Sequence, residues 1–177
     1  IYELGVELSG IDLVDGWYTR QAEAHISSPA EIKQMSINVA DLVIKSNFRS
    51  DATRLDLSEY RWLKSIEIGD DSFSSVDVFR IDGLHHLKSL KIGVNSFTKE
   101  ATDDACSFHV VNCSELESME IGSGSFRSYG GGFELRNLPN LSSIKIGEIG
   151  ENSCNFYWSS FVIQGIIITD GELDRSP

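Results

Sequence analysis

The sequence predicts a mainly β solenoid of about six coils, with short parallel strands on two faces and little helix. Three observations lead to this fold class. The phrase L-x-S-[ILM]-x-I-G recurs along the chain, a second apolar phrase precedes it at a fixed distance, and the segments between them are short and rich in Ser, Gly and Asp. Stacked coils of this kind share one hydrophobic core, so each coil depends on its neighbours for stability.

The first phrase predicts one strand in each coil. Its aliphatic residues alternate with polar ones, which is the period of a half-buried strand, and the glycine that follows ends the strand. Complete copies begin at Leu63, Leu87, Leu116 and Leu141. Weaker copies upstream begin at Leu8, with Ile11 and Leu13, and at Ile32, with Met35 and Ile37. The two upstream copies bring the predicted number of coils to six.

The second phrase predicts another strand, which begins eight residues before the first phrase of the next coil. Its copies are Ala24-x-Ile26, Leu55-x-Leu57, Phe79-x-Ile81, Phe108-x-Val110 and Phe133-x-Leu135, and Phe161-x-Ile163 follows with no full first phrase behind it. A fixed offset indicates a rigid corner, whereas the connector on the other side of the coil varies in length and indicates a tolerant loop. Of these connectors, only the segment 39–46 is predicted to hold a helical turn or two.

Equivalent residues of successive coils should form columns about 4.8 Å apart in the core. One predicted column contains Phe73, Phe97 and Phe126, with Tyr18 and Leu42 at the same place. Another contains Tyr60, Leu84, Cys113, Leu138 and Ile166, which makes Cys113 a core residue and not a nucleophile. Ser72, Ser96 and Ser125 precede the phenylalanines, and their hydroxyls should satisfy backbone groups of the loops.

The pattern continues without a linker, so residues 1–177 are predicted to form a single repeat domain. Neither end shows a polar cap and the chain opens on Ile1, so we expect a fragment of a longer repeat array. The net charge of -12 would repel a phosphate backbone, which argues against nucleic acid. The longest apolar run, at residues 166–168, is far too short to cross a bilayer.

The spacing of metal-ligand residue types predicts no metal site or cofactor. Cys106, Cys113 and Cys154 form no close pair and leave one thiol over, which fits neither a disulfide framework nor a zinc signature. The acidic pairs 70–71 and 103–104 lack the spacing of a calcium loop. We therefore interpret the cysteines as small buried hydrophobes and the acidic pairs as solvated loops.

Residues 87–97, with Asn95, follow the pattern L-x-x-L-x-I-G-x-N-S-F. This pattern resembles the L-x-x-L-x-L-x-x-N-x-L segment of leucine-rich repeats, and I-G-x-x-S-F is similar to the I-G-x-x-A-F of BspA-like repeats in bacterial and protist surface proteins. The resemblance covers about residues 4–166, but other copies carry Gly16, Ala40, Asp71 or Gly124 in place of the asparagine. It implies a protein-binding or adhesive module. It favours a cell-surface or secreted protein and leaves a cytoplasmic one open.

The long loops 38–54, 93–107 and 147–160 should emerge on one edge of the solenoid, and this loop edge is the preferred recognition site. Loop length costs little stability there, and binding residues commonly lie on such loops. The third loop contains Tyr157 and Trp158, an aromatic pair of the kind that anchors interfaces, although either ring could instead cover the core. Trp62 stands where other coils carry polar residues, so it is a surface contact candidate or simply lies over a loop.

A second, less favoured site is the concave face of the first strand of each coil, which displays a ladder of serines and alternating charges. Its residues are Ser65, Glu67, Ser89, Lys91, Ser118, Glu120, Ser143 and Lys145. Opposite charges on adjacent strands stabilise a solvated sheet without any ligand. The ladder is therefore better explained as a structural feature than as a binding site.

These observations favour a non-catalytic binding module for a protein or a glycan. Two alternatives stay open: a purely structural segment of a longer array, and a parallel β-helix enzyme that cleaves polysaccharide. Such an enzyme needs carboxylates grouped on neighbouring coils. Glu67 and Glu120 are instead two coils apart with Lys91 between them, which argues against catalysis. The sequence predicts no oligomeric state.

Overall fold

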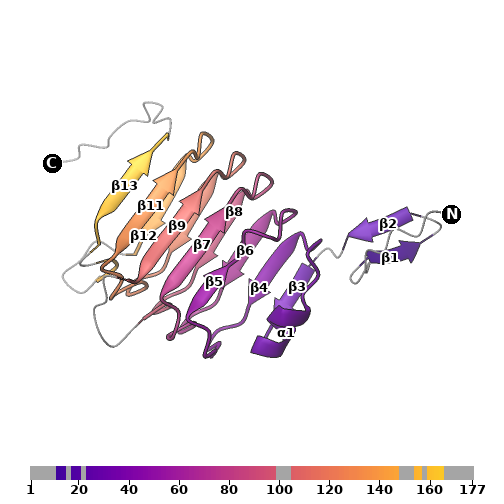
Figure 1. Ribbon diagram of the computed structural model, residues 1–177, viewed down its shortest axis with the longest axis horizontal. Coiled ribbons are helices and arrows are strands. Elements are labelled where there is room, and N and C mark those ends of the chain that lie inside the picture. Colours follow the sequence, from indigo (N-terminus) through magenta and orange to yellow (C-terminus); the bar gives the residue numbers. More distant parts are fainter. Residues whose placement is uncertain are drawn as a thin grey trace.

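The computed structural model of the chain describes residues 11–14, 17–20, 23–98, 105–147, 154–156 and 159–165 (Figure 1). Near the N-terminus, β1 (Ile11–Val14) and β2 (Trp17–Arg20) form a two-stranded antiparallel hairpin. All other strands belong to two parallel sheets. The one helix of the described residues, α1 (Pro29–Gln34), has only six residues, so the chain is mainly β as predicted.

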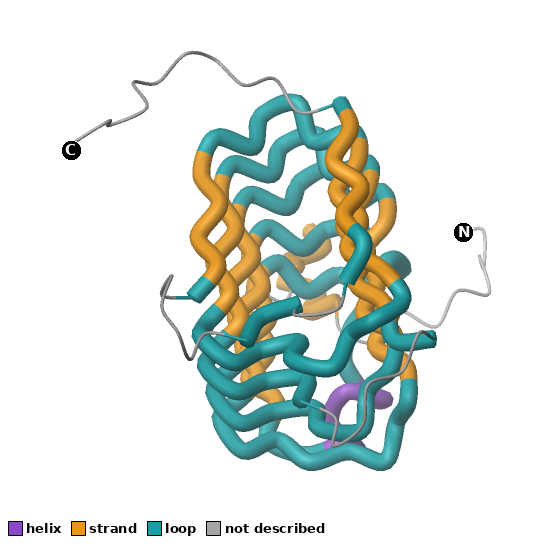
Figure 2. The backbone as a smooth tube through the Cα atoms, turned by 90° about the vertical axis from the view of Figure 1, so that its left-hand side faces the viewer, coloured by secondary structure: helices purple, strands orange, loops and turns teal. Residues whose placement is uncertain are grey.

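The two sheets are built by a chain that alternates between them. The first sheet contains β3 (Glu23–Ile26), β4 (Asp41–Ile44), β6 (Ser65–Ile68), β8 (Ser89–Ile92), β10 (Ser118–Ile121) and β12 (Ser143–Ile146). The second contains β5 (Arg54–Asp56), β7 (Val78–Asp82), β9 (Ser107–Val111), β11 (Gly132–Arg136) and β13 (Phe161–Gln164). Figure 2 shows the two sheets facing each other, with connectors at both edges. The result is a β-solenoid of about four turns.

The strand register confirms that both predicted phrases form strands in these turns and that equivalent residues are aligned. In the first sheet, Ser65, Ser89, Ser118 and Ser143 are direct neighbours on successive strands. In the second sheet the same holds for Leu55, Phe79, Phe108, Phe133 and Phe161. The apolar residues of the two phrases point inward, and most of the residues between them are polar and point outward, because side chains alternate between the two faces of a strand.

The two upstream coils of the prediction were wrong. Leu8 lies outside the described residues, and Ile11 and Leu13 belong to the antiparallel hairpin. At the second copy, Ile32 lies in α1, where Pro29 occupies the first turn and Glu31 accepts a hydrogen bond from the backbone N–H of Ser27 at 2.6 Å. These are helix-starting features, and they outweigh an aliphatic spacing that fits a helix as well as a strand.

The strands on either side of α1 were also assigned wrongly. Ala24 and Ile26 lie in β3 of the first sheet, beside Leu42 and Ile44, and not in the second sheet. The segment 39–46, which was predicted to be the helical one, contains β4. Here α1 occupies the connector after β3, so this part of the chain has no second-sheet strand.

Columns of phenylalanine fill the core between the sheets. Phe97 stacks on Phe73 and on Phe126, with ring centroids 5.1 and 4.6 Å apart, and Phe156 continues the column. At the other end Phe48 lies 4.9 Å from Phe73, in the place predicted for Leu42. A second column, Phe79, Phe108 and Phe133, meets the first edge to face. Tyr60, Leu84, Cys113 and Leu138 are buried as predicted, and Ile166 lies outside the described residues.

The serine hydroxyls satisfy loop backbone groups, as predicted. Ser96 Oγ accepts from the backbone N–H of Ser72 at 3.2 Å and donates to the Gly69 carbonyl at 2.9 Å. Ser125 repeats this pattern one coil further on, with the Ser96 N–H at 2.9 Å and the Gly93 carbonyl at 2.6 Å. All three serines are buried, so each hydroxyl replaces a bond that the backbone would otherwise make with water.

The two ends of the solenoid differ. At the N-terminal end, Ile32 and Met35 pack against the core, and Ala24 and Ile26 in the edge strand β3 are buried. The segment of α1 therefore covers part of the core at this end. At the C-terminal end the core positions of β12 and β13 are uncovered, since Ile144 is 41% exposed, Phe161 54% and Ile163 57%.

Candidate functional site

Three surfaces of the solenoid carry polar side chains that could act in recognition. We call the outer side of the first sheet the ladder face, the outer side of the second sheet the second-sheet face, and the edge formed by connectors from the first sheet to the second the loop edge. No helix among the described residues is long and apolar enough to span a membrane. In the same residues, no group of three or more His, Cys, Asp or Glu side chains is placed to hold a metal ion.

The ladder face brings together all eight residues predicted for the concave ladder. They line a hollow of about 640 Å³, which Glu23 and Asp41 extend at its N-terminal end. Glu67, Lys91, Glu120 and Lys145 are neighbours on successive strands, so the predicted alternation of charge is confirmed.

Several groups of the ladder face are already partnered. Lys91 Nζ lies 2.9 Å from Glu67 Oε1, and Ser65 Oγ donates to Asp41 Oδ1 at 2.6 Å. The hydrogen bond and charge of Glu67 raise the pKa of Lys91 above its ordinary value, and Glu120 and Asp70 add to the shift. Lys91 and Glu67 are both exposed, so their ion pair contributes at most about 1 kcal/mol. The four charged ladder residues cancel one another, Glu23 and Asp41 add two negative charges at one end, and short serine side chains lie along one row.

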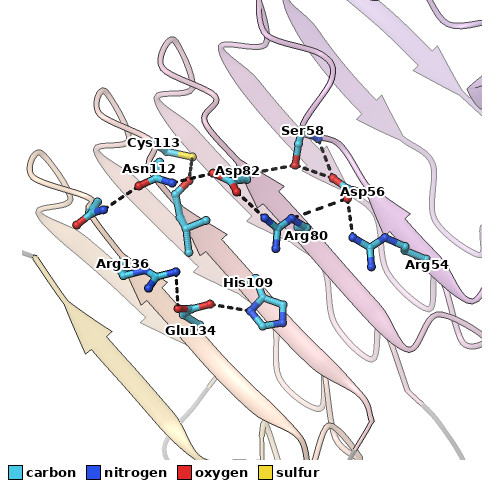
Figure 3. Close-up of polar contacts among 12 residues, drawn as sticks. Arg54, Asp56, Ser58, Arg80, Asp82, His109, Asn112, Cys113, Glu134 and Arg136 are labelled. Atoms are coloured by element: carbon cyan, nitrogen blue, oxygen red, sulfur yellow. Dashed lines mark hydrogen bonds and ion pairs between the residues drawn. The ribbon is translucent and has the colours of Figure 1, made fainter.

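The second-sheet face carries a network that the sequence analysis missed (Figure 3). Three arginines each bind a carboxylate two residues away on the same strand: Arg54 with Asp56 at 2.8 Å, Arg80 with Asp82 at 2.5 Å, and Arg136 with Glu134 at 3.1 Å. His109 Nδ1 lies 2.9 Å from Glu134 Oε2 on the neighbouring strand. The signal was present in the sequence, because residues i and i+2 of a strand share a face.

Hydrogen bonds extend this network toward the short connectors, where Ser58, Asn112 and Asn137 lie. Asn112 Nδ2 donates to Asp82 Oδ1 at 2.8 Å, and Asn137 Nδ2 donates to Asn112 Oδ1 at 2.8 Å. Partial burial works to raise the pKa of Asp56, but hydrogen bonds from Ser58 and Arg54 outweigh it, so this pKa lies below its ordinary value. Hydrogen bonds therefore stabilise the anionic form of Asp56. Asp56, Asp82 and Glu134 each have an arginine partner.

Tyr157 and Trp158, the aromatic pair predicted to anchor the loop edge, lie outside the described residues. Trp62 is half-buried and stacks on His86, with ring centroids 5.3 Å apart and an interplanar angle of 5°. It lies in the connector from β5 to β6, which is the opposite edge of the solenoid. The structure therefore does not join Trp62 to the loop edge, and its ring covers a neighbouring coil.

The described part of the loop edge contains a second hollow, of about 440 Å³. Four successive connectors contribute to it, and its lining consists of Arg49, Asp71, Ser74, Asn95, Thr98, Gly124 and Arg127. Both arginines are exposed. The described residues provide neither guanidinium group with an ion pair or a side-chain hydrogen bond. These arginines were also missed, because nothing in the repeat pattern distinguishes them from other loop residues.

The backbone below this hollow is held firmly. Asp71 and Asn95 have positive φ values of 53° and 52°, a conformation that Asn and Asp tolerate better than most residues. The Asp71 N–H donates to the Val94 carbonyl at 2.9 Å, and the Asn95 N–H donates to the Ser123 carbonyl at 2.9 Å. Gly124 follows at the equivalent position, where a Cβ atom would collide with the Asn95 side chain.

Comparison of the chain with models of protein families, with curated protein sequences and with solved structures gave no match.

Proposed function

We propose that the chain is a non-catalytic binding module that recognises a protein or a glycan through its loop edge. The leucine-rich and BspA-like resemblance of the repeat phrase supports a binding role. Tyr157 and Trp158 support the choice of edge, because by sequence they fall in the connector from β12 to β13. The proposal places the protein at a cell surface or in a secreted form, in keeping with the same resemblance.

One observation carries the choice of surface: Arg49 and Arg127 line a hollow without a counter-ion among the described residues. On the second-sheet face, each of three arginines forms an ion pair with a carboxylate: Arg54, Arg80 and Arg136. On the ladder face Lys91 is paired with Glu67. A guanidinium group with no intramolecular partner keeps its five N–H donors available to a ligand.

The proposal includes no catalysis. A carboxylate that acts as a general acid needs a raised pKa, and Asp56 has a lowered one. Asp82 and Glu134 are held by arginines in the same way. This arrangement favours a structural role for the acids of the second-sheet face.

A paired set of variants tests the choice of surface. The full chain is screened against arrays of glycans and peptides, and binding isotherms are then measured for Arg49→Ala/Arg127→Ala and for Lys91→Ala/Lys145→Ala. Both double variants remove two exposed positive charges, so non-specific electrostatic effects are matched. We expect only the first to weaken binding, by at least about tenfold, with unchanged melting temperatures. Loss of binding in the lysine variant alone would assign recognition to the ladder face.

A second candidate function is a structural segment of a longer repeat array. The observation that favours it is the uncovered C-terminal end, where Ile144, Phe161 and Ile163 occupy core columns yet are exposed. Another coil of the same kind would bury them. This function predicts that no array ligand binds, and that removing the apolar surface by Phe161→Ser lowers self-association in sedimentation experiments.

A further inference from the structure

We propose that the loop-edge hollow binds a carboxylate-bearing sugar chain, that is, an acidic glycan. This inference rests on the proposed function and adds the chemical class of the ligand. It is drawn from the seven lining residues, their charges and the coils that carry them.

Two arginines lie at the ends of the hollow. Arg49 follows β4 and Arg127 follows β10, so their connectors are three coils apart, roughly 14 Å at the strand spacing of a sheet. The planar guanidinium group binds a carboxylate through two parallel hydrogen bonds. A ligand that reaches both arginines is therefore extended along the solenoid axis, and it carries acidic groups that are well separated.

The residues between the two arginines are polar. Asp71, Ser74, Asn95 and Thr98 supply a carboxylate, two hydroxyls and an amide. Together these groups accept and donate hydrogen bonds, as the hydroxyl groups of a sugar require. Among the described residues the lining contains no apolar side chain, so they offer a peptide no pocket for hydrophobic residues, which usually supply much of the affinity for peptides.

The described lining of the hollow is positively charged, whereas the whole chain is acidic. The hollow carries two arginines and one aspartate, a local charge of +1 in a chain whose net charge is -12. A dense polyanion, such as nucleic acid or a heavily sulfated chain, would be repelled by the rest of the molecule. A chain of uncharged hydroxyls with an occasional carboxylate meets the arginines without that cost. The arrangement thus favours a sparsely charged glycan over other anions.

The test uses the full chain and a panel of defined ligands measured by isothermal titration calorimetry. The acidic probes are trigalacturonic acid and a hyaluronan tetrasaccharide, each of which carries more than one carboxylate. The controls are the methyl esters of both probes, which are neutral, an oligo-Glu peptide, and heparin. We expect at least one acidic probe to bind, and its neutral or uncharged counterpart to bind at least tenfold more weakly.

Variants then locate the site. Arg49→Ala/Arg127→Ala should abolish binding of the acidic glycan, and Arg49→Lys/Arg127→Lys should weaken it about tenfold, because lysine keeps the charge but not the paired hydrogen bonds. Lys91→Ala/Lys145→Ala should leave binding unchanged. Circular dichroism and melting curves verify that each variant is folded.

The outcomes separate this inference from the proposed function. If no acidic probe binds, or if the oligo-Glu peptide or heparin binds more tightly than all of them, the acidic-glycan assignment is wrong. The proposed function survives that result if another array ligand still loses affinity in the arginine variant. If the lysine variant alone loses binding, both the assignment and the loop-edge proposal are wrong.

Discussion

Three phenylalanines of the core, Phe73, Phe97 and Phe126, have positive φ values of 59°, 57° and 57°. This conformation costs a bulky residue roughly 1–2 kcal/mol, so something must hold each ring in place. The aromatic column does so, because each of the three rings contacts a ring above and a ring below and is fully buried. An aromatic pair contributes about 0.5–1.5 kcal/mol beyond simple burial, which offsets the strain.

Cys113 gives a prediction about pH at the same scale. Burial, with a smaller contribution from Asp82, raises the pKa of this thiol from 9.0 to about 11. Between those two pH values the unfolded chain loses the thiol proton and the folded chain keeps it. Below about pH 9 the thiol does not affect the pH dependence of stability. As the pH rises above about 9, the free energy of unfolding decreases, and this group accounts for up to about 3 kcal/mol of the decrease.

Urea denaturation at several pH values between 8 and 11 measures the effect. The comparison is between the wild-type chain and Cys113→Ala, which lacks the thiol. Burial also raises the pKa of Tyr60 and Tyr129, so both proteins should lose stability at high pH. The wild-type curve should fall more steeply, and parallel curves for the two proteins would contradict the assignment of the shift to Cys113.

At the scale of an element, the glycines that follow β6, β8 and β10 are explained by the stacking of coils. A Cβ atom on Gly122 would lie 2.5 Å from the carbonyl carbon of Gly93 and from the nitrogen of Val94 in the previous coil. Gly83 differs, because its φ is 72° but the nearest atom to its added Cβ, on Arg61, is 3.8 Å away. Gly122 is required because the neighbouring coil leaves no room for a Cβ atom, and Gly83 is required because its φ is positive.

Alanine substitutions at these two positions should therefore differ in cost. Gly83→Ala should destabilise the fold by about 1–2 kcal/mol through its positive φ alone. Gly122→Ala should cost at least about 3 kcal/mol, because two backbone segments must move apart. Chemical denaturation of both variants tests this, and equal costs would show that the coils are less closely stacked at this corner than the structure indicates.

Much of the fold was predictable wherever the repeat phrase is complete. In the turns from β5 to β12 the aliphatic positions of both phrases set the register, because a one-residue shift would expose the whole inner row. The residues before β5 were not predictable in this way. The spacing of Ile32 and Met35 suits a helix or a strand, and the distinguishing features, Pro29 and Glu31, are local to that turn.

The site was less predictable than the fold, for a physical reason. The ladder residues follow from strand periodicity, so all eight were found and the structure brings them together. The hollow between Arg49 and Arg127 depends on side chains from connectors several coils apart, which no periodic pattern specifies. The arginine–carboxylate pairs of the second-sheet face follow the patterns R-x-D and E-x-R. These patterns predict ion pairs only after the segments are known to be strands, because residues i and i+2 then share a face.

At the scale of the whole molecule, the stability of a solenoid is close to a sum over coils and the interfaces between neighbouring coils. The central coils have neighbours on both sides, and their core residues are almost fully buried. Among the described residues, the last coil has a neighbouring coil on one side only. Stability should therefore decrease toward β12 and β13, and these strands should exchange their amide protons faster than β6 or β8.

Leu90 and Ile144 provide a matched test of this gradient, because they occupy the same column of the first sheet. Leu90 is 1% exposed in β8, whereas Ile144 is 41% exposed in β12. Leu90→Ala should cost about 2–5 kcal/mol, as expected for a cavity in a packed core. Ile144→Ala should cost only about 1–2 kcal/mol, because less apolar surface is returned to water. Denaturation curves give the two free energies, and hydrogen exchange shows which strands are affected. Equal costs would mean that Ile144 is as well covered in solution as Leu90, which would indicate that another coil or a second molecule packs on this end.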